Sequence, residues 1–179
     1  MGSVLRLFGL LRDKLFGFFS KKKLEYKTFH DPLGNFTIQF PKHWKFDSDV
    51  AVVDGRYTIS FDSKDIDFTI AVDANLGENF DFDKYAHMEL ESPTAGIIAS
   101  ISKDKFRGMP AYSREFKYES GGKDFFGGGS MFYAKPLVFS INWSAKEKDR
   151  EKIMEIFDHM RNSLLIHQNF SIRSKSNRL

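Results

Sequence analysis

The sequence predicts an α+β domain in which an antiparallel sheet packs against helices, preceded by an amphipathic N-terminal helix. Most of the chain alternates apolar and polar residues with a period of two, the pattern of strands that bury one face. Two stretches change to the spacing of helices that bury one face. With 179 residues, 41% of them hydrophobic and 16% aromatic, the chain can form one such domain with short extensions.

Residues 1–23 form the first predicted element, a helix with one broad apolar face. At about 100° per residue this face gathers Val4, Leu7, Phe8, Leu11, Leu15, Phe18 and Phe19. Three lysines, Lys21, Lys22 and Lys23, follow the apolar run. A helix of this kind lies in the plane of a membrane surface, where its apolar side chains enter the acyl boundary and its lysines contact anionic headgroups.

The same segment is predicted to be neither a transmembrane span nor a secretory signal peptide. Charged residues, among them Arg12, Asp13 and Lys14, interrupt the apolar run that either would need. Arg6 stands where N-myristoylation would require Ser or Thr. Two alternatives to membrane binding remain: the helix docks in a groove of a partner protein, or it packs on its own domain.

Residues 24–167 form the predicted globular domain. Its alternating runs place on one face of successive strands Phe36, Ile38 and Phe40; Tyr57, Ile59 and Phe61; Phe68, Ile70 and Val72; Ile97, Ala99 and Ile101; Tyr112, Arg114, Phe116 and Tyr118; and Leu137, Phe139, Ile141 and Trp143. We expect an antiparallel sheet that is covered on its apolar side. Gly121 and Gly122 predict a two-residue hairpin turn between Tyr118 and Phe125, because both glycines can adopt a positive φ.

Two helices interrupt and close this series of strands. The first begins near Asp81 and ends before Pro93, and its predicted buried residues are Phe82, Tyr85, Ala86 and Leu90. The second is expected to begin at Ser144, which stands three residues before Glu147 with the spacing of a capping box. It is expected to lie across the apolar side of the sheet through Ile153, Ile156, Phe157, Met160 and Leu164.

Charge is distributed unevenly along a chain whose net charge is +3. Residues 1–25 carry +4 and residues 165–179 carry +3, which leaves −4 for the residues between them. An acidic domain is not expected to bind nucleic acid through its body, whereas basic ends suit contact with an anionic surface. Residues 168–179 are predicted to form a basic, flexible tail.

The residue types and their spacing predict no catalytic centre, metal site or cofactor, and identify no small-molecule substrate. The chain has no Cys, and none of its five His has a second His three or four residues away. We interpret Asp62, Asp65 and Asp67 as a solvated acidic turn, because their spacing is not that of an EF-hand loop. Glycines 127–129 lack the context of a phosphate loop, and a bulge or close approach by the last helix is the expected cause.

Three short motifs carry a resemblance to a known fold. They are Phe40-Pro41-Lys42-His43-Trp44, Gly108-Met109-Pro110-Ala111-Tyr112, and Phe139-Ser140-Ile141-Asn142-Trp143 before a helix that ends at Ser163-Leu164. From about Tyr26 to Leu165 the order of elements resembles the PsbP-like α/β/α sandwich of photosystem extrinsic proteins, a Ran-binding nuclear transport factor family and many prokaryotic domains. The resemblance implies a non-enzymatic accessory or assembly role, often beside a membrane complex.

We therefore expect a non-catalytic accessory or assembly domain that is attached peripherally to a membrane, or to a membrane complex, through residues 1–23. The cytoplasmic face of the membrane is favoured over export. The expected partners are an anionic membrane surface, a protein, or both. The alternative is a soluble subunit of a protein complex that uses the same helix for docking, and an enzyme with a cleft between sheet and helices ranks below both.

Overall fold

The computed structural model describes residues 24–47, 51–64, 66–91 and 97–167. The predicted helix in residues 1–23, with all of its candidate membrane- or partner-binding residues, lies outside the described residues, as does the predicted tail. No helix of the described part of the chain is both long enough and apolar enough to cross a membrane.

Ten strands, two α-helices and one 3-10 turn make up the described residues. In chain order they are β1 (Tyr26–His30), β2 (Phe36–Pro41), β3 (Lys45–Phe46), β4 (Arg56–Ser63), β5 (Ile66–Asp73), α2 (Phe82–Glu91), β6 (Ile97–Phe106), β7 (Met109–Ser120), β8 (Lys123–Ala134), β9 (Leu137–Lys146), η1 (Glu147–Asp149), α3 (Arg150–Ser163) and β10 (Leu165–Ile166). Every strand pairing is antiparallel, as the alternating pattern predicts.

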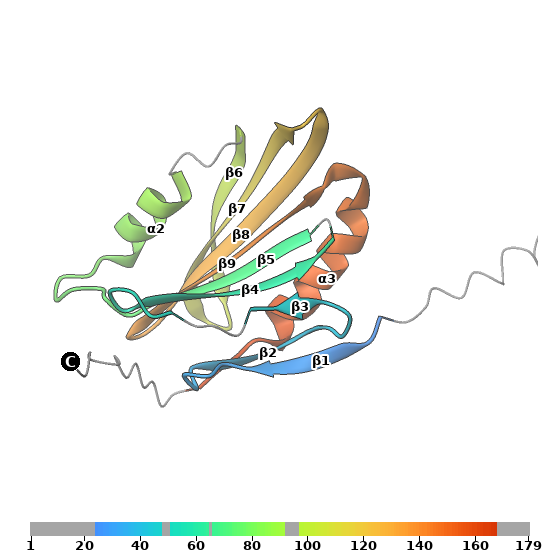
Figure 1. The fold of residues 1–179 in the computed structure, drawn as a ribbon. Helices are drawn as coiled ribbons and strands as arrows, with labels where there is room; N and C mark the ends of the chain where they lie inside the picture. Colours follow the sequence, from blue (N-terminus) through green and yellow to red (C-terminus); the bar gives the residue numbers. More distant parts are fainter. Residues whose placement is uncertain (1–23, 48–50, 65, 92–96, 168–179) are drawn as a thin grey trace, which may run out of the picture.

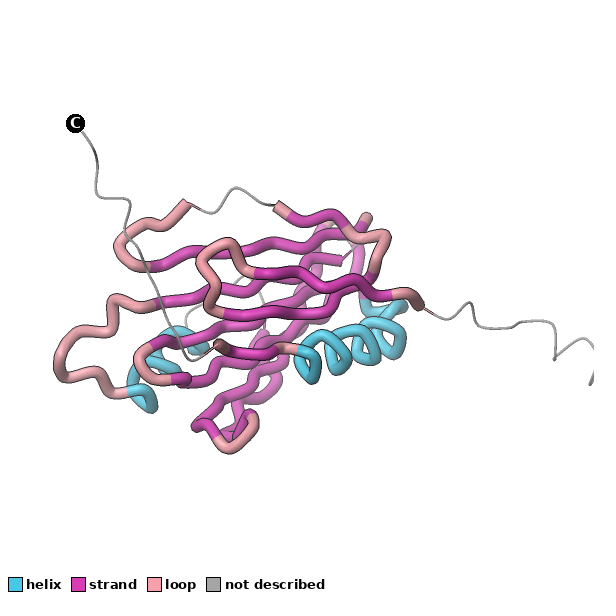
Figure 2. The backbone as a smooth tube through the Cα atoms, turned by 90° about the horizontal axis from the view of Figure 1, so that it is seen from below, coloured by secondary structure: helices cyan, strands magenta, loops and turns pink. Residues whose placement is uncertain are grey.

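The strands form two sheets, whereas the alternation predicted only one. The smaller sheet has the order β1-β2-β10, and the larger has the order β3-β4-β5-β9-β8-β7-β6. Strand β9 lies between β5 and β8 and so joins the β4–β5 hairpin to the β6–β7–β8 meander. The larger sheet lies between α2 on one side and α3 with the smaller sheet on the other (Figure 1). Seen from below, the smaller sheet lies in front of the larger one, with α3 alongside (Figure 2).

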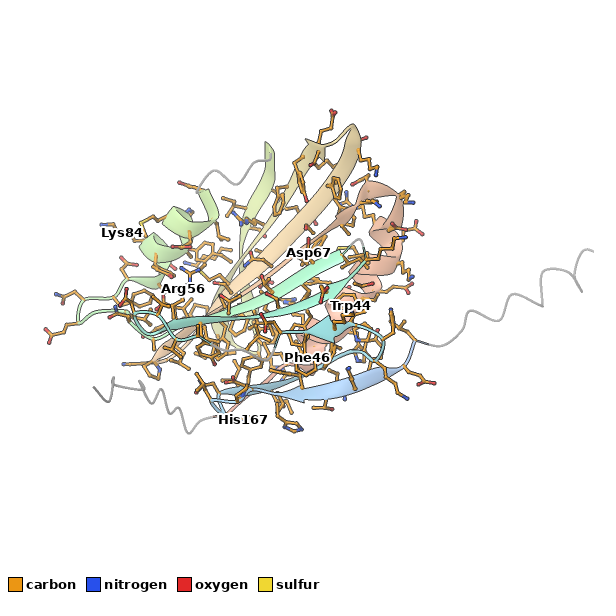
Figure 3. The ribbon with its side chains drawn as sticks, viewed as in Figure 1. Trp44, Phe46, Arg56, Asp67, Lys84 and His167 are labelled. Carbon is orange, nitrogen blue, oxygen red and sulfur yellow. The ribbon has the colours of Figure 1, made fainter. Side chains whose placement is uncertain are left out.

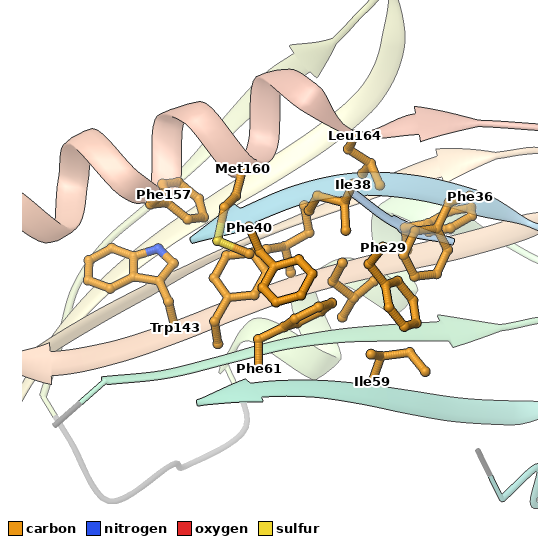
Figure 4. Close-up of a cluster of buried hydrophobic side chains, with 14 of the residues drawn as sticks. Phe29, Phe36, Ile38, Phe40, Ile59, Phe61, Trp143, Phe157, Met160 and Leu164 are labelled. Atoms are coloured by element: carbon orange, nitrogen blue, oxygen red, sulfur yellow. The ribbon is translucent and has the colours of Figure 1, made fainter. Parts of the chain in front are cut away.

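Aromatic side chains dominate the core between the two sheets. Phe36, Ile38 and Phe40 of β2 are buried there, as the alternation predicts. They meet rings from the larger sheet, for example Phe61, whose ring centroid lies 4.8 Å from that of Phe40. The predicted apolar residues of the last helix join this core, which places α3 on the apolar side of the larger sheet (Figure 4). Such ring pairs add to the free energy gained from burial alone.

A second, smaller core lies beneath α2. Its helix residues Phe82, Ala86 and Leu90 are buried as predicted, whereas Tyr85 is half-buried and its hydroxyl donates to Asp73 at 2.9 Å. On the sheet side the cluster contains Tyr112, Met131 and Val138. Because side chains alternate between the two faces of a strand, these three lie on the opposite face from the main core.

A buried polar network anchors the turn between β1 and β2 to β4. The Asp31 carboxylate accepts hydrogen bonds from the Tyr57 hydroxyl at 2.7 Å and from the backbone N–H groups of Asn35 at 2.9 Å and Leu33 at 3.2 Å. The Asn35 side chain donates to the Tyr57 oxygen at 2.9 Å. Burial raises the pKa of the Tyr57 hydroxyl above its ordinary value, so this group stays a hydrogen-bond donor.

The last helix does not begin at the capping box predicted from Ser144 and Glu147. Strand β9 continues to Lys146, and Ser144 pairs with Asp67 on one side and Gly127 on the other. A 3-10 turn covers Glu147–Asp149, and α3 begins only at Arg150. The prediction was wrong because the alternating burial extends to Ala145, which is 1% exposed, so sheet pairing continues through the expected cap.

Glycines 127–129 lie in a regularly paired strand, and neither of the expected causes explains them. The register of β8 is unbroken with both β7 and β9, so the strand has no bulge there. The neighbouring strands, rather than the last helix, fill the space: a Cβ atom at Gly128 would lie 2.6 Å from the Trp143 ring, and one at Gly127 would overlap the Phe116 ring. Gly127 and Gly128 therefore accommodate rings on opposite faces of the sheet, and Gly129 accommodates the Asn142 side chain.

Candidate functional site

The apolar residues of helix α2 pack on only part of their face of the larger sheet. Directly opposed residues share a face, so the register divides this face into rows that run across the strands. The apolar residues of α2 pack on the rows that contain Tyr112, Met131 and Val138. The remaining rows form what we call the open face, and they contain Ser60, Thr69, Asn142, Gly129 and Arg114; then Asp62, Asp67, Ser144, Gly127 and Phe116; then Lys146, Phe125 and Tyr118.

Three stacked rings form one side of the open face, and we call Phe116, Tyr118 and Phe125 the aromatic row. Tyr118 and Phe125 are opposed across the β7–β8 hairpin, with ring centroids 5.1 Å apart and planes 13° apart. Phe116 stacks next to Tyr118 at 6.1 Å. All three are half-buried, although no described helix or strand packs over them. Gly127 leaves the space in which the Phe116 ring lies.

Arg114 connects the aromatic row to the end of α2. Its guanidinium lies 5.3 Å from the Phe116 ring centroid and donates a hydrogen bond to the carbonyl of Leu90 at 3.0 Å. A cation at this position also complements the negative end of the helix dipole. Burial lowers the pKa of Arg114 below its ordinary value, and the Glu89 carboxylate partly offsets that shift. Arg114 is therefore held in place and partly desolvated at the edge of the open face.

Two carboxylates form the other side of the open face. Asp62 and Asp67 are directly opposed across β4 and β5, and both are exposed. No ion pair joins either of them to a cation in the described ranges. In Figure 3, Arg56 lies near α2 while Asp67 lies farther along the sheet. The open face thus combines stacked rings, a fixed arginine and Lys146 with two exposed acids.

In the part of the chain that the structure describes, no group of three or more His, Asp or Glu is arranged to hold a metal ion. Of the predicted acidic turn, Asp62 and Asp67 are exposed and Asp65 lies outside the described residues. Trp44 and Trp143 are 3% and 4% exposed and belong to the core.

The aromatic row was not predicted as a site, although its residues were placed on strands. The signal that could have found it is the turn at Gly121 and Gly122, since a two-residue turn fixes the register of its hairpin. Counting back from that turn opposes Tyr118 to Phe125 and Phe116 to Gly127, as the structure shows. The glycine opposite Phe116 then indicates a ring lying flat on the sheet.

The sequence matches no protein-family model and no curated protein. Its fold, however, is shared by several solved structures. Cyanobacterial PsbP from Synechocystis sp. PCC 6803 matches with a TM-score of 0.58 and 10% identity, over 83% of this chain and 96% of that one. LpqN of Mycobacterium tuberculosis, described as involved in cell envelope biogenesis, matches with a TM-score of 0.52 and 12% identity, over 82% and 92%. The Saccharomyces cerevisiae Ran-binding protein Mog1p matches with a TM-score of 0.50 and 10% identity, over 80% and 96%.

These matches define the class of structure. The chain is an α+β domain with an antiparallel sheet between helices. More particularly, it has the PsbP-like fold, as the resemblance from its sequence motifs predicted. At 10–14% identity the likeness is one of fold.

Proposed function

We propose that this chain is a non-catalytic accessory domain that binds a protein partner through the open face and is held at a membrane surface by residues 1–23. The observation that carries the first part is the aromatic row beside Arg114. Aromatic side chains and Arg are enriched at the centres of protein interfaces and account for much of their binding energy. Mog1p, a protein of the same fold, is described as Ran-binding, which supports a protein as the class of partner.

The charges of the open face indicate what the partner presents. Asp62 and Asp67 lie across the sheet from the aromatic row and have no described counter-ion. A partner with an apolar or aromatic group over Tyr118 and a basic group over the two aspartates is complementary to this arrangement. Such complementarity governs the association rate and the choice of partner more than it governs affinity.

A double substitution tests the protein-binding surface. Tyr118→Ser with Phe125→Ser removes two rings whose loss from the centre of an interface is expected to weaken partner binding more than tenfold. Tyr26→Ser is the matched control, because Tyr26 is a half-buried tyrosine of the smaller sheet that stacks on His159 of α3. The measurement is cross-linked recovery of partners from native membranes, quantified against the unmodified chain.

The expected result is loss of the same proteins with the double variant and their retention with Tyr26→Ser. Recovery of an unchanged set of proteins by all three chains would show that the open face does not bind a partner. A thermal melt of each variant excludes unfolding as the cause of a loss.

Attachment to a membrane is the second part of the proposal, and the predicted apolar face and three lysines of residues 1–23 support it. The full chain is expected to float with anionic liposomes, whereas a chain that begins at Leu24 is expected to stay at the bottom of the gradient. Replacing Lys21, Lys22 and Lys23 by Gln is expected to weaken binding about one hundredfold, at roughly 1 kcal/mol for each lysine.

If the full chain stays at the bottom as completely as the shortened one, lipid attachment is wrong. Recovery of one protein through residues 1–23 without lipid binding would instead support the alternative, a subunit that docks through its N-terminal helix.

A further inference from the structure

A groove of about 520 Å³ lies where the β6–β7 and β8–β9 turns meet β10. Its floor is apolar and continuous with the main core, because Phe106, Ala134 and Leu164 are at most 8% exposed. Met109 and Ile166 are half-buried and form its walls. Paired strands and the segment after α3 hold these residues, so the groove exists before any ligand arrives.

Among the described residues that line the groove, the rim carries two cations and no carboxylate. Arg107 donates a hydrogen bond to the carbonyl of Asn162 at 2.6 Å, and its guanidinium lies 5.5 Å from the Phe106 ring centroid. These contacts fix the guanidinium and leave other N–H groups free to donate. Lys135 is exposed, and no ion pair joins it to an acid in the part of the chain that the structure describes.

The acid beside the groove in sequence is already engaged. Asp104, two residues before Phe106, forms an ion pair with Arg161 of α3, whose guanidinium donates to its carboxylate at 3.1 Å. Within the described ranges, the cations of the rim therefore line the groove without a local carboxylate to neutralise them. An apolar floor below an uncompensated positive rim is complementary to a molecule that has an apolar body and an anionic head.

We propose that this groove binds an anionic amphiphile of small-molecule size, a chain carboxylate such as a fatty acid. Its volume lies within the roughly 300–1,000 Å³ of small-molecule sites, and its lining matches theirs, mostly apolar with a few fixed polar groups. The apolar chain lies along Met109 and Ile166, and the carboxylate lies between Arg107 and Lys135. The planar fork of an arginine matches the two oxygens of a carboxylate.

Calorimetric titration of the full chain with decanoate, below its micelle concentration, tests the proposal. One decanoate is expected to bind per chain, and decanol and decylammonium are expected to bind at least tenfold more weakly. Lys135→Gln and Arg107→Asn are each expected to weaken decanoate binding about tenfold, since each removes a charge-assisted hydrogen bond. Lys84→Gln, at an exposed position on α2, is the matched control and is expected to bind decanoate unchanged.

Arg107→Asn is also a variant that keeps the fold. Arg107 and Gly108 form the β6–β7 turn with φ values of 50° and 83°, and Asn adopts such positive φ more readily than Arg. Ile166→Ser tests the wall of the groove and is expected to weaken decanoate binding while Arg107 and Lys135 remain. Methyl resonances of Met109, Leu164 and Ile166 are expected to shift on titration.

Four results would overturn the proposal. Equal affinity for decanol or decylammonium would show that the groove binds apolar chains without recognising the carboxylate. Unchanged decanoate binding by the Lys135 and Arg107 variants would show that the ligand binds elsewhere, for example on residues 1–23. Absence of decanoate binding is the third. The fourth is a dimer of the unmodified chain in sedimentation that becomes a monomer in the Ile166→Ser variant. That result would show that the groove binds a second copy of the chain.

Discussion

Replacing Asp31 by Ala is expected to lower the free energy of unfolding by about 3–4 kcal/mol, the largest effect predicted for a single polar side chain of this protein. The Asp31 carboxylate is the acceptor for the Tyr57 hydroxyl and for the backbone N–H of Asn35, and both of those residues are at most 2% exposed. Alanine would leave these donors buried without an acceptor, and each unsatisfied group costs about 1–3 kcal/mol.

Urea unfolding of three variants measures this effect. Tyr57→Phe leaves Asp31 its backbone partners but removes one donor to Asp31 and the acceptor of the Asn35 side chain, so a smaller loss of about 2–3 kcal/mol is expected. The double variant is expected to lose less than the sum of the two, because both single changes break the same 2.7 Å hydrogen bond. A stability of Asp31→Ala within 1 kcal/mol of the unmodified chain would contradict the role given to the network.

Replacing Gly128 by Ala is expected to lower the free energy of unfolding by about 2–4 kcal/mol, although Ala is normally the better residue in a strand interior. A Cβ atom there would lie 2.6 Å from the Trp143 ring and 2.9 Å from the carbonyl oxygen of Arg114. The Trp143 ring cannot move away easily, because it packs against two other rings. Its centroid lies 5.0 Å from that of Phe126 and 5.3 Å from that of Phe157 of α3. The added methyl group would therefore separate α3 from the sheet.

Gly34→Ala is the matched control for this prediction. Gly34 has a φ of 76°, which disfavours Ala by about 1–2 kcal/mol, but no described residue has an atom within 4 Å of its Cβ position. Gly128→Ala is thus expected to be the more destabilising of the two in thermal unfolding, and to change the near-ultraviolet circular dichroism of Trp143. The reverse order would show that the space above Gly128 adapts more easily than the packing indicates.

The sequence was sufficient to predict those strands in which large apolar side chains alternate with polar ones. Strands β2, β4, β5 and β9 were predicted on the correct faces, because each has three or more buried apolar residues at alternate positions. Strand β1 was missed because Phe29 is its sole buried residue, so it has no apolar period to detect. The smaller sheet was missed for the same reason, since β1 and the two-residue β10 complete it.

The candidate site was less predictable than the fold. The Gly121–Gly122 turn determined which residues of β7 and β8 are opposed, so the aromatic row itself could have been derived. The extent of α2 along the sheet could not be predicted from the sequence. It depends on tertiary contacts such as the hydrogen bonds from Tyr85 to Asp73 and from Lys103 to Asp83. These contacts decide which rows the helix covers and which remain open.

The central place of β9 also bears on how the protein is made. The β4–β5 hairpin and the β6–β7–β8 meander leave the ribosome before residues 137–146 do, and each then has an unpaired edge that only β9 can complete. Pairing in the smaller sheet is completed later still, because Leu165–Ile166 pair with the start of β2. Such late, long-range pairing carries a loop-closure penalty and slows folding. Until β9 and β10 are synthesised, the nascent chain therefore exposes two partial sheets with unpaired, aggregation-prone edges. Protection by a chaperone is expected to matter most during that interval.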